Sequence, residues 1–306
     1  MSAPQIIAGP AIIQHGGQVY YSEGDITVSL ARDTFLVSSA CHGTIDERLV
    51  SQMVTLAFKP VSCLDVVAKY LPFAVTQIGT LLINQSEPAS VVVWARDGRK
   101  TTWGAGFVSQ LPSFNLSAVQ VPVGDMQIVA IGNPVKDLTD AAAWNTFAEA
   151  AFADTSFNET TILTPKYLAT WGEIFEDLES ETGFLVEPAM SFSMKSIANW
   201  GNVNALLTDI TIGVRFTPVG LDEDDLWAAL RLQGSDAITP GDSLTKDDED
   251  LVISGGGVSF TLHNAGPKTG ITRYGLEPLR IGEVAFVTRR TWTAGVADPL
   301  FTVAFS

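Results

Sequence analysis

Short stretches in which apolar and polar residues alternate dominate this sequence, and such alternation predicts half-buried β-strands. Most stretches are rich in β-branched and aromatic residues and are bounded by Gly, Pro, Asn or Asp. In the N-terminal half they predict strands over residues 25–32, 52–60, 79–84, 89–95, 115–121 and 125–131. In the C-terminal half they predict strands over 190–194, 209–216, 250–254, 257–263 and 283–290. We therefore expect a mainly β protein.

Helical patterns are fewer. Residues 63–71 and 221–233 each follow a Phe-x-Pro strand end and carry acidic residues in the first turn, where the helix dipole favours them. Residues 138–155 are rich in Ala and have a helical period, with Thr139 or Asp140 as the N-cap. This third stretch predicts a linker or packing helix between the two halves.

The strand pattern also repeats within the chain. Residues 39–60 match residues 197–218 without a gap, at the offset that pairs Phe58 with Phe216 (216 − 58 = 158). The same offset aligns Ala40 with Ala198, Gly43 with Gly201, Leu49 with Leu207 and Pro60 with Pro218. Self-similarity of this kind is the sequence signature of a duplicated unit.

The register persists beyond this segment. Downstream, the offset of 158 brings the turn residues Asp97 and Gly98 onto Gly255 and Gly256, and places Gly124 on Gly282 and Val129 on Val287. Upstream, Pro10 and Gly17 meet Pro165 and Gly172 at an offset of 155. The alternative is that all alternating strands look alike, but a constant offset over two strands and their turns favours duplication. We expect one β-domain over 1–137, a helical linker over 138–158 and a second β-domain over 159–306.

Composition agrees with two domains and adds a statement about the surface. A chain of 306 residues has the length of about two domains. Charged residues make up 17% of the chain, against about 25% in a typical soluble protein. We therefore expect part of the surface to be buried against other copies of the chain.

The charge is negative throughout. The net charge is −16, divided into −5 over residues 1–158 (13 acidic, 8 basic) and −11 over 159–306 (21 acidic, 10 basic). The sequence has no basic patch to neutralise phosphates, which disfavours tight binding of nucleic acid. The acidic runs at 222–225 and 246–250 are candidates for a divalent cation, but neither has the spacing of a calcium loop, and solvated loops explain them as well.

Residues with catalytic or metal-binding chemistry are scattered. No two of the three histidines, His15, His42 and His263, have helical metal-ligand spacing. Cys41 and His42 are adjacent, so in a strand their side chains point to opposite faces. His42 aligns with Trp200, so the repeat does not reproduce a histidine site.

Other motifs are equally lacking. The sequence contains no nucleophile elbow, phosphate-binding loop or dinucleotide fingerprint. Asp65 and Glu223 coincide across the repeat, but helix capping explains both. Two cysteines, Cys41 and Cys63, indicate a reducing compartment without a disulfide framework. We expect no catalytic residue, cofactor, metal ion, signal peptide or membrane helix.

Long stretches of both halves carry a resemblance to a known family. They run from "GPAIIQHGGQVYYSEGDITVSLARD" through "LAFKP" to "RDGRKTTWGAGFVSQLPSFNLSAVQVPVGDMQIVAI", and again over "TDITIGVRFTPVG" and "LEPLRIGEVAFVTRR". In these stretches the sequence resembles the tail tube proteins of long-tailed bacteriophages. The resemblance implies a β-sandwich or split barrel with one flanking helix in each domain. It also implies subunits packed edge to edge into rings, stacked as a tube around a β-lined channel, in a virion tail assembled in the cytoplasm of a bacterial host.

If single-domain relatives build sixfold rings, a two-domain chain implies trimeric, pseudo-hexameric rings, with hexameric rings as the alternative. The expected partners are further copies of the chain, other tail proteins, and double-stranded DNA that passes through the lumen without tight binding. We expect no membrane anchor. An acidic lumen would repel phosphates, although the net charge also fits a role in solubility.

Other functions stay open at this point. A tail terminator, distal tail or capsid decoration protein would have a related sandwich fold. A carbohydrate-binding or adhesion module would use exposed tryptophans, for which the candidates are Trp94, Trp103, Trp200 and Trp292. An enzyme has the least support because the required constellations are missing.

Overall fold

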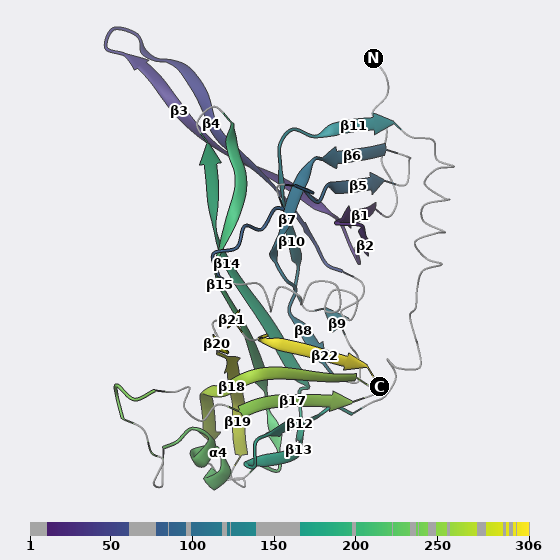
Figure 1. The fold of residues 1–306 in the computed structure, drawn as a ribbon, viewed down its shortest axis with the longest axis vertical. Helices are drawn as coiled ribbons and strands as arrows, with labels where there is room; N and C mark the ends of the chain where they lie inside the picture. The colour runs from purple at the N-terminus through teal and green to yellow at the C-terminus, as the bar shows by residue number, and fades with distance from the viewer. Residues whose placement is uncertain are drawn as a thin grey trace.

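The computed structural model is mainly β, as the alternating pattern predicts, and its sheets are antiparallel (Figure 1). Among the described residues it has one helix, α4 (Glu223–Ala229), inside the predicted 221–233. The predicted helix over 63–71 lies outside the described residues, as does 138–155 after Leu138. The structure describes residues 11–60, 78–84, 86–95, 99–117, 121–122, 124–138, 166–197, 200–221, 223–232, 237, 239–243, 249–255, 258–273, 280–289, 292–293, 296–297 and 299–305.

Two sheets form the N-terminal half. The five-stranded sheet has the order β11-β6-β5-β1-β2, with bounds Val135–Leu138, Arg99–Trp103, Val91–Ala95, Ala11–His15 and Gln18–Tyr21. The four-stranded sheet has the order β3-β4-β10-β7, with bounds Thr27–Ser39, Gly43–Phe58, Met126–Ile131 and Ala105–Gln110. The dipeptide Asp97-Gly98 predicts a β-hairpin, because Asp-Gly accepts the positive φ angles of a type I′ turn. The antiparallel pair β5–β6 confirms this hairpin, although the two turn residues lie outside the described part.

One long sheet forms the C-terminal half. Its order is β16-β13-β12-β17-β18-β19-β15-β14-β8-β9, with β22 (Phe301–Phe305) also paired to β18. The bounds are Pro218–Val219, Phe175–Ser180, Leu168–Trp171, Glu249–Gly255, Val258–Arg273, Arg280–Thr288, Gly201–Phe216, Phe184–Ile197, Phe114–Leu116 and Val121–Pro122. A separate two-stranded sheet pairs β20 (Trp292–Thr293) with β21 (Val296–Ala297).

The strand order of the N-terminal half recurs in the C-terminal half. The series β22-β18-β17-β12-β13 runs like β11-β6-β5-β1-β2, and β14-β15-β19-β18 runs like β3-β4-β10-β7. The single strand β18 takes the places of both β6 and β7, which Gly104 separates in the N-terminal half. The long β18 is therefore what joins two sheets into one in the C-terminal half.

The hairpins β3–β4 and β14–β15 agree residue by residue. The bounds of β4 and β15 differ by 158 at both ends. The pairing of β3 with β4 shifts after Asp33 and again after Val37, and the pairing of β14 with β15 shifts at the corresponding Ser191 and Lys195. Such β-bulges are specific features of a strand pair, so two coincident bulges are far more informative than alternation alone.

The turns of the two hairpins also agree. Gly43 and Gly201 each begin the returning strand at φ values of 69° and 70°, a conformation that favours glycine. Before each glycine, a backbone hydrogen bond closes the turn, from the His42 N–H to the Ser39 carbonyl (3.3 Å) and from the Trp200 N–H to the Ile197 carbonyl (3.0 Å).

Each half buries an apolar cluster between its strands. Leu56, Phe58 and Ile128 are buried in the N-terminal cluster, and Val214, Phe216 and Phe286 are buried at the positions 158 residues later. The alternation that predicted the strands thus also identified their buried faces. Aromatic contacts tighten the C-terminal cluster, where the rings of Phe216 and Phe286 stack at 5.9 Å.

The two halves interlock. Strand β8 belongs to the N-terminal half in sequence but pairs with β14, and its Phe114 and Leu116 lie in the C-terminal cluster. A third cluster of buried residues, Ile83, Phe107, Val129 and Ala205, contains residues from both halves.

Two strand predictions are corrected by the structure. Residues 79–84 form no strand and contribute one isolated bridge, from Leu81 to Leu206. The predicted strand 115–121 is shorter, because β8 ends at Leu116 and β9 begins at Val121. No helix of the described chain is long and apolar enough to cross a membrane.

Close packing at Gly106 generates a stability prediction. A Cβ at Gly106 would lie 2.2 Å from Val91 Cγ2 and 2.9 Å from the Val129 carbonyl oxygen, whereas a Cβ at Gly104 would meet nothing within 4 Å. We expect Gly106→Ala to lower the free energy of unfolding by about 1–3 kcal/mol, as overpacking does. Urea denaturation of Gly106→Ala and of the control Gly104→Ala measures the difference. Equal stabilities would contradict the packing described here.

Candidate functional site

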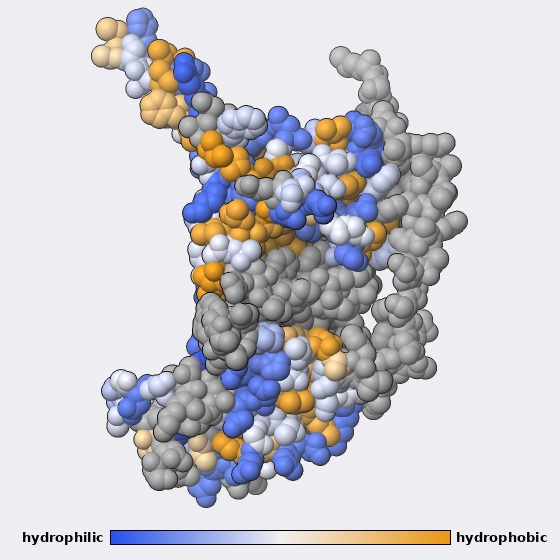
Figure 2. Space-filling model, in the orientation of Figure 1, coloured by the Kyte–Doolittle hydropathy of each residue, from blue (hydrophilic) through white to orange (hydrophobic). Residues whose placement is uncertain are grey.

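The most conspicuous surface feature is the β3–β4 hairpin, which extends away from the body of the molecule (Figure 1). We call residues 27–50 the arm. Large apolar side chains on it are at least half exposed, and Figure 2 shows them as orange atoms among polar ones. They are Val28, Leu30, Phe35, Leu36, Ile45, Leu49 and Val50. So many exposed apolar side chains on one element indicate an interaction surface.

The backbone of the arm also has an open edge. Strand β4 pairs with β3 along one edge, and along the other edge it pairs with β10 only over residues 54–58. In the described part of the chain, no strand pairs with that second edge over residues 43–53. Open N–H and C=O groups of this kind are a template for pairing with another segment.

The equivalent hairpin in the C-terminal half is not left open. Residues 79–83 of the N-terminal half lie along the edge of β15 there. The Gly79 N–H donates to the Leu207 carbonyl (2.8 Å), the Leu207 N–H to the Thr80 carbonyl (3.0 Å) and the Leu82 N–H to the Ala205 carbonyl (2.8 Å). The side chain of Phe192 on β14 meets the Phe107 ring edge-on at 5.1 Å.

Asn204 fixes this contact. It is 1% exposed, and its Nδ2 donates to the Ile83 carbonyl at 2.9 Å while its Oδ1 accepts from the Ile83 N–H at 3.0 Å. The same Oδ1 accepts from the N–H of the next residue, Ala205, at 2.7 Å. A buried amide with these bonds to one residue holds the hairpin in a single register.

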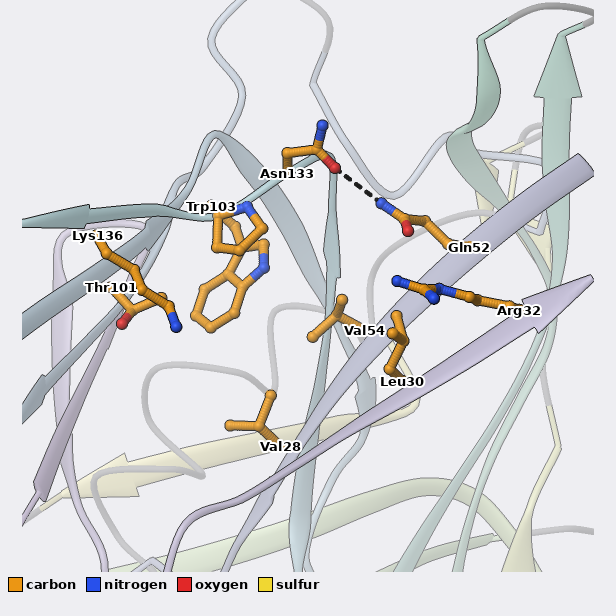
Figure 3. Close-up of a pocket in the computed structure, with 10 residues that line it drawn as sticks. Val28, Leu30, Arg32, Gln52, Val54, Thr101, Trp103, Asn133 and Lys136 are labelled. Atoms are coloured by element: carbon orange, nitrogen blue, oxygen red, sulfur yellow. Dashed lines mark hydrogen bonds between the residues drawn. The ribbon is translucent and has the colours of Figure 1, made fainter. Parts of the chain in front are cut away.

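A groove lies at the base of the arm (Figure 3). Its volume is about 430 Å³. Val28, Leu30, Val54 and Trp103 supply apolar lining, and the buried Trp103 indole N–H has no hydrogen-bond partner among the described residues. Other residues that line it are Arg32, Gln52, Thr101, Asn133, Pro134 and Lys136. Among the described residues, the lining includes no carboxylate or histidine, and its apolar side chains offer a contact surface.

The corresponding place in the C-terminal half is covered. Residues 184–186 of β14 pair with β8. At the offset of 158 they correspond to residues 26–28, where β3 begins. The side chains of Phe114 and Leu116 from β8 are 2% and 1% exposed there. The arm and the groove therefore mark positions at which one half lacks, within the described chain, the cover that the other half has.

The structure places the three histidines apart. His15 is buried in β1 with its Nε2 3.2 Å from the Gly106 carbonyl, and His263 lies between Asp250 (2.9 Å) and Thr302 (3.1 Å). His42 is at the tip of the arm beside the exposed, free Cys41. Cys63 lies outside the described residues. No group of three His, Cys, Asp or Glu among the described residues could hold a metal ion.

The candidate tryptophans whose side chains are described lie in different surroundings. Trp103 is 4% exposed, and Lys100 Nζ lies 4.8 Å from the centre of the Trp94 ring. Trp200 is 81% exposed at the tip of the β14–β15 hairpin, and the side chain of Trp292 lies outside the described part.

The acidic candidates are dispersed as well. Glu223 begins α4, whereas Asp65 lies outside the described residues. From the run 222–225, residues 223–225 are in the helix, and from the run 246–250 only residues 249–250 are described, at the start of β17. Asp250 accepts the backbone N–H of Asn264 at 3.0 Å, so it has a local structural role.

No protein-family model matches the chain, and no curated protein matches its sequence. The arm, the open edge and the groove are therefore the features of the chain that bear on its function. The alternating pattern predicts strands only over residues 25–32 and 52–60 around the arm. The repeat nevertheless indicates the longer hairpin, because residues 39–60 align with 197–218, which include most of the long strand β15.

The burial of His15 predicts a pH dependence of stability. Burial lowers the pKa of His15 below its ordinary value, so the unfolded chain binds a proton more readily than the folded chain. Stability is then highest above the unfolded pKa of about 6.5 and falls as the pH drops through it, by up to about 1.4 kcal/mol per pH unit.

We expect the loss in melting temperature between pH 7.5 and pH 5.5 to be smaller in His15→Gln than in the wild type. The control His42→Gln, at the exposed tip of the arm, should leave the wild-type loss unchanged. Identical losses in the wild type and His15→Gln would show that His15 does not cause the dependence.

Proposed function

We propose that this chain is a structural protein built from two tandem copies of one β-domain, and that it polymerises into stacked rings as a phage tail tube. The observation that carries the proposal is the pair of matched hairpins, one covered within the chain and the other open. We propose no catalytic, cofactor-binding or metal-binding residue.

Three coincidences at the offset of 158 support the duplication. They are the two matched β-bulges, the positive-φ glycines at 43 and 201, and a matched backbone bond at the base of each hairpin. In that bond the Glu23 N–H donates to the Lys59 carbonyl at 2.8 Å, and the Glu181 N–H to the Thr217 carbonyl at 2.9 Å. Chance alternation of strands would not reproduce turns, bulges and base contacts together. Each copy corresponds to a sandwich or split barrel made of the two recurring strand series.

The open surfaces support assembly. The arm exposes apolar side chains and a free strand edge, and the groove lies at its base, so a second copy that docks along the arm would cover both. A low proportion of charged residues fits a subunit with much of its surface in interfaces.

In the proposed tube, three chains close a ring that has pseudo-sixfold symmetry, because each chain supplies two equivalent domains. The net charge of −16 would let double-stranded DNA pass through the lumen without adhering. The other partners are neighbouring tail proteins, and assembly takes place in the cytoplasm of the bacterial host.

A terminator, distal tail or decoration protein is the nearest alternative within the same particle. Such proteins form rings or caps but not long polymers, so the length of the assembly separates them from a tube subunit. The adhesion module would depend on Trp200, the only exposed tryptophan among those whose side chains are described, and one ring is a small sugar platform.

Electron microscopy of the concentrated protein tests the proposal directly. We expect hollow, striated rods in negative stain, and native mass spectrometry of rings released from them should give three chains. Short caps without rods would favour a terminator, and a stable monomer at all concentrations would contradict assembly altogether.

The arm should be necessary for rods. Leu36 and Leu49 correspond to Met194 and Leu207, of which Leu207 is buried and Met194 packs against the cluster shared by the two halves. We expect Leu36→Asp/Leu49→Asp to raise the protein concentration needed for rods by more than about tenfold, since a carboxylate would have to lose water in the contact. The melting temperature of the monomer should not change.

The control for this pair is Val219→Asp/Leu232→Asp, which adds the same charges at side chains that are 48% and 55% exposed outside the arm. Light scattering against concentration measures both variants. Equal effects of the two pairs would mean that added charge, and not the arm, controls assembly.

A further inference from the structure

The open arm has a specific counterpart on the molecule. We propose that the arm of one copy docks on the C-terminal half of a second copy at the segment around Thr239, repeating between chains the contact that β14–β15 makes within the chain. This inference rests on the proposed duplication and ring assembly, and it adds the residues that meet at the junction.

The contact within the chain supplies the template. Residues 79–83 pair with the β15 edge at residues 205–207, through an antiparallel bridge between Leu81 and Leu206. Subtracting 158 from 205–207 gives residues 47–49 of β4, and adding 158 to 79–83 gives residues 237–241. The bridge between chains therefore pairs Arg48 of one copy with Thr239 of the next.

Both surfaces are available in the single chain. Residues 47–49 are exposed, and their edge of β4 has no strand partner in the described structure. Ala237 and residues 239–241 are exposed as well. Residues 237–241 follow α4 closely in sequence. The arm and α4 lie at opposite ends of the molecule in Figure 1, so the contact can form only between copies.

The arm already has the local geometry of the covered hairpin. Asp46 stands at the position of Asn204, and its Oδ1 accepts the N–H of the next residue, Glu47, at 2.8 Å, as the Asn204 Oδ1 accepts the Ala205 N–H at 2.7 Å. The Asn204 Oδ1 also accepts the Ile83 N–H. Asp46 is thus placed to accept the N–H of Gly241, the residue that corresponds to Ile83.

Charge also fits the junction. Ala205 and Ile131 belong to the apolar cluster shared by the two halves. The corresponding residues are Glu47 on the arm and Arg289 after β19 on the second copy. Where the cluster within the chain is apolar, the junction between chains would bring residues of opposite charge into the corresponding cluster, which favours the correct partner and keeps the separate arm soluble.

The contact at the tip of the β14–β15 hairpin also has a counterpart at the tip of the arm. Asn202 Nδ2 donates to the Gln52 carbonyl at 3.3 Å, at the point where Gly201 approaches the backbone of Val50 and Ser51. At the offset of 158, the hydroxyl of Thr44 would donate to the Ile210 carbonyl of the second copy. Residues 208–209 of β15, which correspond to 50–51, are exposed in the single chain.

Disulfide trapping tests the junction. In the intrachain contact, the hydrogen bonds flank Leu81 and Leu206 rather than joining them, and such a pair has a Cα separation of about 4.5 Å, within the range that a disulfide spans. In a Cys41→Ser/Cys63→Ser background, we compare Arg48→Cys/Thr239→Cys with the control Leu81→Cys/Leu206→Cys. Both are oxidised after assembly and analysed on non-reducing gels.

We expect Arg48→Cys/Thr239→Cys to move most chains into covalent dimers and closed trimers, and the control to form its bond within one chain. If Arg48→Cys/Thr239→Cys stays monomeric on the gel while the control forms its disulfide, the proposed junction is wrong. Rods without cross-links would refute this junction and leave the tube function standing. Cross-links without rods would support the junction and refute the tube function.

A charge-exchange series provides a second test that needs no oxidation. Glu47→Arg should raise the protein concentration needed for assembly at least tenfold. The added change Arg289→Glu should restore the wild-type concentration. Arg289→Glu alone should be as defective as Glu47→Arg. Failure of the double variant to recover, with all three variants folded by circular dichroism, would contradict the pairing of these two residues.

Discussion

A long β-hairpin must have its backbone groups and apolar side chains covered, and the rest of this structure can be understood from that requirement. Each N–H and C=O on an open strand edge needs a partner or water, and apolar side chains beside such an edge favour a protein partner. In the C-terminal half the cover comes from residues 79–83 and β8. In the N-terminal half no strand of the described chain pairs with the same edge of β4 over residues 43–53, and the Gln52 carbonyl there accepts a hydrogen bond from the Asn202 side chain. The described chain therefore contains one covered hairpin edge and one uncovered hairpin edge of the same geometry.

This arrangement explains why the two hairpins differ in chemistry while they agree in geometry. The covered hairpin carries Asn204 and Ala205, which are buried as soon as the chain folds. The arm carries Asp46 and Glu47 at the same positions, and both are exposed. Charged residues on an exposed edge limit wrong pairing and aggregation. The polar side chains thus suit an exposed edge, while the matched bulges keep the geometry of the two hairpins alike.

Much of the fold could be predicted from sequence because it depends on local pattern. Alternation identified the buried faces of β4, β10 and β15, and Asp-Gly predicted the β5–β6 hairpin. The repeat offset anticipated the pairing equivalence of the two halves. The error at residues 79–84 has a physical reason: the run Leu81, Leu82 and Ile83 is apolar like a strand, but the segment turns and bends along the edge of β15 and forms only an isolated bridge. Alternation within a segment does not reveal which distant segment pairs with it.

The candidate site was harder to predict. The exposed side chains Phe35, Leu36 and Leu49 look like core residues in sequence, because burial depends on which neighbours are present. Single Trp, His and acidic residues were candidates for sugar or metal sites because of their chemistry. In the structure, those that are described lie apart, in cores, turns and strand ends. The arm stands out only when the two halves are compared, because the covered hairpin of the C-terminal half shows which contacts the arm lacks among the described residues.

The central claim is that one contact geometry is used both within and between chains, and a cryo-electron microscopy map of the assembled particle tests it most directly. The contact between β14–β15 and the N-terminal half should superpose on the contact between the arm and the next chain, with Arg48 facing Thr239. A map in which the arm points into solvent, or in which the two contacts cannot be superposed, would contradict the account.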